Sequence, residues 1–275
     1  KAAELTILHD REQQTSLREL LEKTLGSDGL KETLRRCLTQ LIGVSWLSLL
    51  PKGGIFLADE KTQMLRLLVS YKLAPEIISL CAQIPFGYCH CGRAAISGKL
   101  QFVHCVDENH DVSFAGMADH GHYIVPLASD GKMLGVLALY LPTNFKSTVD
   151  KEQFLSSVAD ILAGFIQRKK AELALHDHSI ALQEHQRELQ SLADNLPDTL
   201  IRFDCDGRVL FINRTMTDLL DCNAIDVLGK SLHQFTSTGH LQALERTVLA
   251  VAKTGEEAEL ELLIPRSTDD RTVYL

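Results

Sequence analysis

Residues 122–140 of this 275-residue chain read HYIVPLASDGKMLGVLALY. The stretch holds two apolar segments, 122–127 and 133–140, which predict β-strands. Between them Ser129, Asp130 and Gly131 predict a tight turn, in which glycine adopts positive φ without steric cost. Strands joined by so short a turn pair antiparallel, so this stretch predicts part of an antiparallel sheet.

The segments around this hairpin carry helical and strand patterns in turn. Helices are predicted over 10–24, 30–41 and 75–81, and strands over 46–50, 54–58, 64–70 and 100–103. A long helix is expected from Ser147-Thr148 onward, because either hydroxyl can cap it. Helices packed around one antiparallel sheet give an α+β sandwich.

Charge and composition exclude several classes of protein. The net charge is −8, from 36 acidic and 28 basic residues, and no long Lys/Arg run is present to bind nucleic acid. There is no apolar run of about 18 residues for membrane contact, and no secretory leader. Seven scattered cysteines do not form a disulfide framework and fit a reducing cytoplasm. Because the chain begins at Lys1 rather than Met, we expect it to be a piece of a longer protein.

Metal-ligating residue types are concentrated between positions 89 and 122. This window holds three of the seven cysteines and five of the eleven histidines: Cys89, His90, Cys91, His104, Cys105, His110, His120 and His122. Thiolate sulfur and imidazole nitrogen are the ligands that soft and borderline metals prefer. Cys89 and Cys91 are expected in a loop before a helix that begins near Gly92, where the helix dipole would acidify their thiols. The window therefore predicts a metal or redox site.

A coiled-coil pattern begins at residue 175. Apolar and histidine residues alternate three and four positions apart, at Leu175, His178, Leu182, His185, Leu189, Leu192 and Leu196. We expect a parallel two-stranded coil that forms a homodimer through the helix 150–196, ending before Pro197. A single amphipathic helix packed on its own domain is the alternative.

Three motifs resemble those of the GAF sensory domains, over roughly residues 27–168. Residues 54–60, GIFLADE, are similar to the family's second strand and hairpin. The IPFG run at 84–87, followed by GRAA at 92–95, resembles its pocket-entry loop and helix. Residues 125–137 resemble the paired closing strands and are the most specific of the three signals.

The last part of the chain resembles a PAS domain, with an α/β sheet whose last strand is expected to be truncated. The resemblance rests on the DCDG hairpin at 204–207, on Asn213 after the second strand, and on LGKS at 228–231. The implied organisation is an N-terminal helix (1–26), a GAF sensor (27–168), a coiled-coil signalling helix (169–196) and a PAS domain (197–275).

The GAF resemblance implies one ligand cavity bordered by both halves of the Cys/His window. His104 and Cys105 are neighbours on an expected strand and would point to opposite faces. The preferred metal or cofactor ligands are Cys89, Cys91, Cys105 and one or two of His110, His120 and His122. Such a mixed set suits iron or zinc, and iron with an open position binds a gas such as nitric oxide or oxygen. Thiol redox sensing without a metal, and a pocket without a cofactor, stay open as alternatives.

Larger cofactors are not expected. The Cys-His pair that phytochrome-like GAF domains use for a bilin would fall near Met117 to His120, where this chain has no cysteine. Haem ligation by His233 or His240 is not expected either. Cyclic-nucleotide binding, another role of the family, has no residue signature here.

Together the two resemblances imply the sensory input region of a cytoplasmic signal-transduction protein, without an enzymatic activity of its own. A small-molecule or gas signal would act through the helix 150–196 by rotation or a change of register. The expected downstream output domain is a histidine kinase of a two-component system or a diguanylate cyclase. The alternatives are a thiol enzyme such as a methionine sulfoxide reductase, with Cys89 or Cys91 as nucleophile, and a ligand-free dimerisation module.

Overall fold

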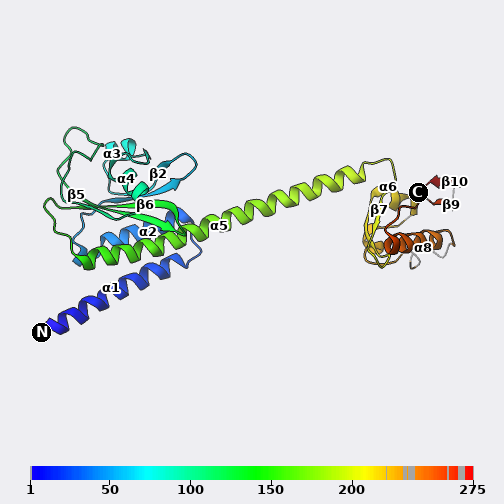
Figure 1. Cartoon of the computed structure of the whole chain (residues 1–275), viewed down its shortest axis with the longest axis horizontal. Helices are drawn as coiled ribbons and strands as arrows, with labels where there is room; N and C mark the ends of the chain where they lie inside the picture. Colours follow the sequence, from blue (N-terminus) through cyan, green and yellow to red (C-terminus); the bar gives the residue numbers. More distant parts are fainter. Residues whose placement is uncertain are drawn as a thin grey trace. The chain divides into compact units, whose positions relative to one another are not determined.

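The computed structural model describes residues 2–220, 222–231, 234, 239–258, 260–265 and 270–274 (Figure 1). The chain divides into two compact units, residues 1–175 and 176–275, and each is described by itself. Unit 1 is a mixed α+β structure, as expected. Its elements are α1 (Ala2–Thr24), α2 (Leu30–Ile42), the 3₁₀ turn η1 (Ser45–Leu47), β1 (Gly53–Asp59), β2 (Met64–Tyr71), α3 (Pro75–Leu80), β3 (Gln83–Pro85), α4 (Cys89–Ser97), β4 (Gln101–Val103), β5 (Gly121–Ser129), β6 (Lys132–Leu141) and the start of α5 (Val149–Asp194).

The strands of unit 1 form one six-stranded antiparallel sheet in the order β3-β2-β1-β6-β5-β4. The predicted hairpin is confirmed as β5 and β6, with Ser129 opposite Lys132. Asp130 and Gly131 between them have φ of 51° and 73°. Positive φ at both central residues is typical of a type I′ turn, whose twist matches that of the flanking strands.

Helices cover both faces of this sheet (Figure 1). Helices α1, α2 and α5 bury their apolar sides in one core with the sheet, because Leu34, Leu38 and Leu41 recur along one side of α2 and Leu155 and Leu162 along one side of α5. The other face is covered by α3 and α4, which form smaller clusters with the sheet and with the segment between β4 and β5. The candidate site lies on this second face.

The predicted strand at 46–50 is wrong. Residues 45–47 form the turn η1, and Ser48 follows in the left-handed region with φ of 54°. The Trp46 ring packs edge-on against Phe154 of α5, at 4.9 Å between ring centroids. The apolar residues here therefore fill the core between helices while the chain reverses from α2 into β1, so their apolar character did not indicate a strand.

Unit 2 begins within α5 and continues as β7 (Ile201–Phe203), β8 (Val209–Ile212), α6 (Arg214–Leu220), α7 (Ala224–Val227), α8 (Gly239–Thr254), β9 (Glu261–Pro265) and β10 (Asp270–Tyr274). The expected hairpin around Asp204-Cys205-Asp206-Gly207 is present, and its backbone N–H groups at Asp206 and Arg208 donate to the Asp204 carboxylate. His233 and the side chain of His240 lie outside the described residues.

In the described part of the chain, no helix has both the length and the apolar character that crossing a bilayer requires.

Candidate functional site

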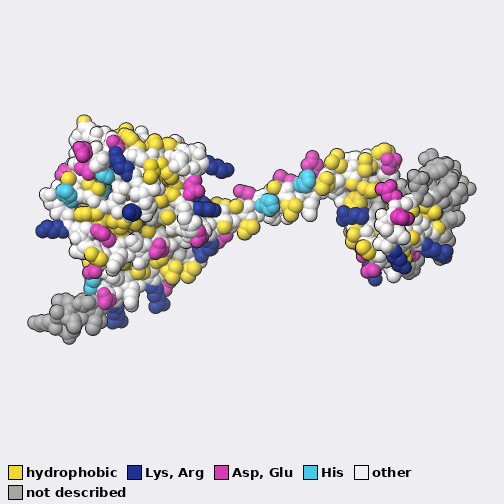
Figure 2. All heavy atoms as spheres, in the orientation of Figure 1, with side chains coloured by type: hydrophobic (Ala, Val, Ile, Leu, Met, Phe, Trp, Pro, Cys, Tyr) yellow, Lys and Arg dark blue, Asp and Glu magenta, His cyan; other side chains and the backbone are white. Residues whose placement is uncertain are grey.

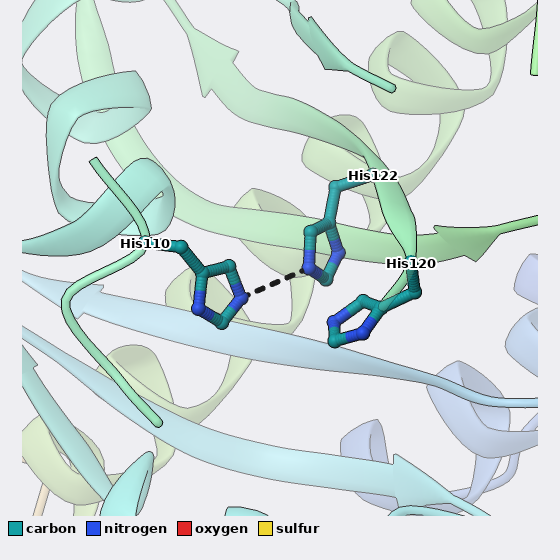
Figure 3. A group of neighbouring side chains, drawn as sticks. All are labelled: His110, His120 and His122. Atoms are coloured by element: carbon teal, nitrogen blue, oxygen red, sulfur yellow. Dashed lines mark hydrogen bonds between the residues drawn. The ribbon is translucent and has the colours of Figure 1, made fainter. Parts of the chain in front are cut away.

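Three histidines from two segments meet on the sheet face that α3 and α4 cover. His122 is the second residue of β5, His120 lies just before that strand, and His110 comes from the loop between β4 and β5. Figure 3 shows the three rings facing one another. One nitrogen of each ring lies within 4.8 Å of the others, and no other metal-capable group of this kind was found among the described residues.

The distances within this three-histidine cluster fit a shared metal ion. Nε2 of His110 and Nε2 of His122 are 3.1 Å apart. For an ion placed 2.0–2.1 Å from both nitrogens, the N–metal–N angle would be about 100°, which lies between the octahedral and tetrahedral values. The His120 ring lies 4.6 Å from that of His122, at an interplanar angle of 78°.

His120 shows which of its nitrogens is free to bind. Its Nδ1 lies 2.7 Å from the carbonyl oxygen of Ala118, which can only accept, so Nδ1 carries the proton. Nε2 therefore keeps its lone pair, and it is buried without a hydrogen-bond partner. His120 and His122 are only 2 % and 4 % exposed, so water does not freely solvate them. Buried polar atoms are rarely left unpartnered, and a bound ion would satisfy this lone pair.

The electrostatics of the cluster favour neutral imidazoles. Burial lowers the pKa of His110 and His120, and it lowers that of His122 furthest, with added repulsion from the two neighbouring histidines. Neutral histidine is the form that binds metals. The structure therefore holds three metal-competent rings in place without protonating them.

A cavity of about 30 Å³ adjoins the cluster. The polar residues of its lining are His90, His110, His122 and Tyr140. The lining also contains the three cysteines Cys81, Cys89 and Cys91, and the other members include Phe56, Ile77, Ile84, Val112 and Ile124. The space is large enough for water-sized occupants but not for a nucleotide or a tetrapyrrole.

Polar contacts fasten the loop that carries His110 to the first turns of α4. The Asp111 carboxylate accepts a hydrogen bond from the Cys89 backbone N–H at 2.6 Å and from the Arg93 guanidinium at 3.1 Å. His90 Nε2 donates to Asp107 Oδ1 at 2.8 Å. The position of His110 therefore depends on contacts between this loop and α4, in addition to the sheet.

The sequence-predicted site residues fall into three groups. His110, His120 and His122 come together, and Cys89 and Cys91 line the adjoining cavity. Cys105 lies in a bend after β4, outside both the three-histidine cluster and the cavity lining. Sequence reasoning missed Cys81, at the end of α3, because a single cysteine far from the Cys/His window gives no signal of its own.

The structure corrects the expected loop position of both cysteines and the expected acidification of Cys91. Helix α4 begins at Cys89 rather than near Gly92, so both cysteines lie in its first turn. Cys91 is 8 % exposed, and burial raises its pKa well above the ordinary value. The carboxylate of Asp111 accepts the Cys89 backbone N–H, so a side chain of this protein already binds the start of the helix.

Comparisons with known proteins agree with this fold. A family model described as GAF domain matches residues 27–167, and one described as PAS fold matches residues 193–275. Protein YtsP of Bacillus subtilis is 29 % identical over 82 residues, which are 30 % of this chain and 50 % of that protein. The chain thus spans about half the length of the curated relative it matches.

Three solved structures are similar to this chain over 58–60 % of its length. The GAF domain of a phosphoenolpyruvate-protein phosphotransferase from Coxiella burnetii has a TM-score of 0.53 at 17 % identity, over 60 % of this chain and 98 % of that one. The corresponding Acinetobacter domain (TM-score 0.49, 19 % identity, 58 % and 95 % covered) and a free methionine-R-sulfoxide reductase from Neisseria meningitidis (0.49, 21 %, 58 % and 91 %) are also similar. The expected order of modules is confirmed: this chain belongs to the GAF domain family and carries a PAS fold after its long helix.

Proposed function

We propose that this chain is the sensory input region of a signal-transduction protein, and that its GAF pocket holds a metal ion through His110, His120 and His122. GAF and PAS domains are typically sensory, which supports the sensing role. The observation that carries the metal proposal is the convergence of two buried histidines and one half-buried histidine, and His120 keeps an unpartnered Nε2 lone pair.

Iron(II) or zinc fits this cluster best. Imidazole is a ligand of intermediate softness, which suits zinc and iron more than calcium or magnesium. Three protein ligands leave a coordination position open, as in metal sites that exchange a small molecule. In this proposal Cys89 and Cys91 form the cavity wall, and Cys105 takes no part.

The signal in this proposal is a small molecule that occupies the open position. The adjoining cavity of about 30 Å³ accommodates water-sized or diatomic species. Its apolar walls exclude bulk water and would strengthen binding to the ion.

A hydrogen-bonded connection supports a relay from the site to α5. Tyr123 follows His122 in β5 and points to the opposite face of the sheet, toward the helices. Its hydroxyl donates to Ser147 Oγ at 2.6 Å, and Ser147 Oγ donates to Glu152 Oε1 in the first turn of α5, also at 2.6 Å. A shift of β5 at the metal site would therefore reach the start of the helix.

We further propose that α5 pairs with the same helix of a second copy. Hydrophobic side chains are visible along the surface of α5 in Figure 2, and Leu175, Leu182, Leu189 and Leu192 are 72 %, 54 %, 53 % and 61 % exposed. Their heptad spacing suits a two-stranded coil, which would bury them against a second copy. A cytoplasmic location and an output domain of kinase or cyclase type stay predictions.

The test is metal analysis of anaerobically purified protein with an absorption spectrum. We expect about one zinc or iron per chain, and a loss of at least tenfold in affinity in His120→Ala and His122→Ala. His104→Ala, which alters an exposed histidine of the same window, is the matched control and should keep the metal. Wild-type protein that takes up neither zinc nor iron(II) when loaded would refute the proposal.

The thiol-enzyme alternative has less support from the site. A nucleophilic cysteine needs an accessible thiolate, whereas the two cysteines named for this role, Cys89 and Cys91, are only 5 % and 8 % exposed. Burial also raises the pKa of Cys91 well above the ordinary value. Metal-free protein that turns over methionine sulfoxide, with loss of turnover in Cys89→Ser, would establish that alternative.

A further inference from the structure

We propose that the ligand recognised by the metal-loaded GAF pocket is a small anion, with at most about three heavy atoms. This inference rests on the metal site proposed above and names the chemical class of its signal. Three observations carry it: the charge of the donor set, the composition of the cavity wall and the size of the cavity.

The first observation concerns charge at the metal. His110, His120 and His122 are neutral donors, so they leave the two positive charges of a divalent ion uncompensated. Isolated charge in a buried site is energetically costly, because little solvent remains to screen it. An anion in the open position would cancel half of this charge, whereas a neutral gas would cancel none.

The second observation is that no carboxylate of the described residues lies among the donor atoms of the three-histidine cluster or in the cavity lining. The cavity lining, among the described residues, contains no Asp, Glu, Lys or Arg. Three carboxylates lie close by, and each is engaged in hydrogen bonds outside the group of metal-donor atoms. Asp107 binds His90, Asp111 binds the Cys89 N–H and Arg93, and Asp119 accepts from the backbone N–H groups of Val106 and His120. A negative group bound directly to the ion must therefore come from the ligand or from a deprotonated thiol.

The thiols of the cavity wall favour the ligand as the source of this negative charge. Burial raises the pKa values of Cys81 and Cys91 in the ion-free chain, so neither thiol supplies a preformed negative charge. A protonated thiol is a weak hydrogen-bond donor, which suits the outer atom of an anion. Neither thiol lies in the group of donor atoms that the three histidines form.

The third observation sets the size limit. A volume of about 30 Å³ holds two or three water-sized atoms, and the remaining wall is formed by bulky apolar side chains such as Ile77 and Val112. Linear anions such as azide and cyanate match this space. Benzoate, or a tetrahedral anion such as sulfate, does not.

The experiment uses the whole chain loaded with Co²⁺, whose visible spectrum reports its ligands. Azide and cyanate are compared with nitrous oxide, a neutral molecule of the same electron count, and with benzoate as a larger anion. We expect azide and cyanate to shift the cobalt bands in a saturable way, at least about tenfold more tightly than nitrous oxide or benzoate. In Cys91→Ala we expect the same cobalt uptake and azide affinity that is several-fold weaker.

The possible outcomes separate this inference from the proposed function. Protein that takes up no cobalt overturns both. Protein that takes up cobalt but responds equally to nitrous oxide and azide, or to neither, overturns the anion proposal alone. A strong sulfur-to-cobalt charge-transfer band, lost in Cys89→Ser or Cys91→Ser, would show that a thiolate fills the position and would also overturn it.

Discussion

Replacing Asn213 with alanine removes four hydrogen bonds from the interior of the PAS-fold unit. Asn213 is fully buried. Its Nδ2 donates to the carbonyl oxygens of Ala193 and Asp198, at 3.0 and 2.8 Å. Its Oδ1 accepts from the backbone N–H groups of Leu200 and Met216, at 2.9 and 3.1 Å. One side chain thus joins the end of α5, the segment before β7 and the start of α6.

The expected loss of stability follows from these bonds. The Met216 N–H also reaches the Asn213 carbonyl oxygen, so it keeps a partner in the variant. The remaining three bonds contribute about 0.5–1.5 kcal/mol each. We therefore expect Asn213→Ala to lower the free energy of unfolding of this unit by about 2–4 kcal/mol, a large share of a typical domain's 5–15 kcal/mol.

Hydrogen exchange on the whole chain measures this effect locally. Peptides covering residues 198–216 should exchange faster in Asn213→Ala, and those of β1, β5 and β6 should not change. The matched control is Asn195→Ala. Asn195 is exposed, and its side chain donates a long hydrogen bond of 3.4 Å to Ser191 Oγ. We expect the control to change stability by less than about 0.5 kcal/mol. Equal exchange in the two variants would refute the assigned role of Asn213.

Four further outcomes are expected. Gly135→Ala should lower the melting temperature markedly, because the added alanine Cβ would lie 2.1 Å from the Phe56 carbonyl oxygen. An unchanged melting curve would contradict this close approach. Asp111→Ala should weaken zinc affinity about 10–100-fold, since this carboxylate fixes the loop of the third histidine, and a competition titration with a chelator measures it. Tyr123→Phe should keep the metal but abolish any ligand-induced change of hydrogen exchange at the start of α5; a retained change would exclude this relay. Metal-free protein should lose stability to urea as the pH falls from 7.5 to 5.5. Burial lowers the pKa of His122 in the folded state, so the unfolded chain takes up the proton first as the pH falls. Below about pH 6.5 the free energy of unfolding should therefore decrease by up to about 1.4 kcal/mol per pH unit. Equal stability at both pH values would show that this histidine is not buried neutral.

The periodic parts of the fold could be predicted from the sequence, because each is determined by local pattern. The apolar runs at 122–127 and 133–140 around Asp130-Gly131 predict the β5–β6 hairpin from local pattern alone. The helical spacing of Leu34, Leu38 and Leu41 likewise specifies α2 and the side that it buries. Pattern failed at 46–50, where an apolar run fills the space between helices instead of pairing in a sheet.

The sequence by itself also determined that residue types able to bind metals are concentrated between Cys89 and His122, but only the tertiary structure decided which residues meet. His110 joins His120 and His122 because Asp107 and Asp111 fasten its loop to α4. Cys105, equally close in sequence, stays outside the cluster, while Cys81 reaches the cavity from α3. The physical reason is that loop positions follow no period. Their side chains are placed by contacts between segments far apart in the chain, and burial at the same contacts sets which thiols and imidazoles keep or lose a proton.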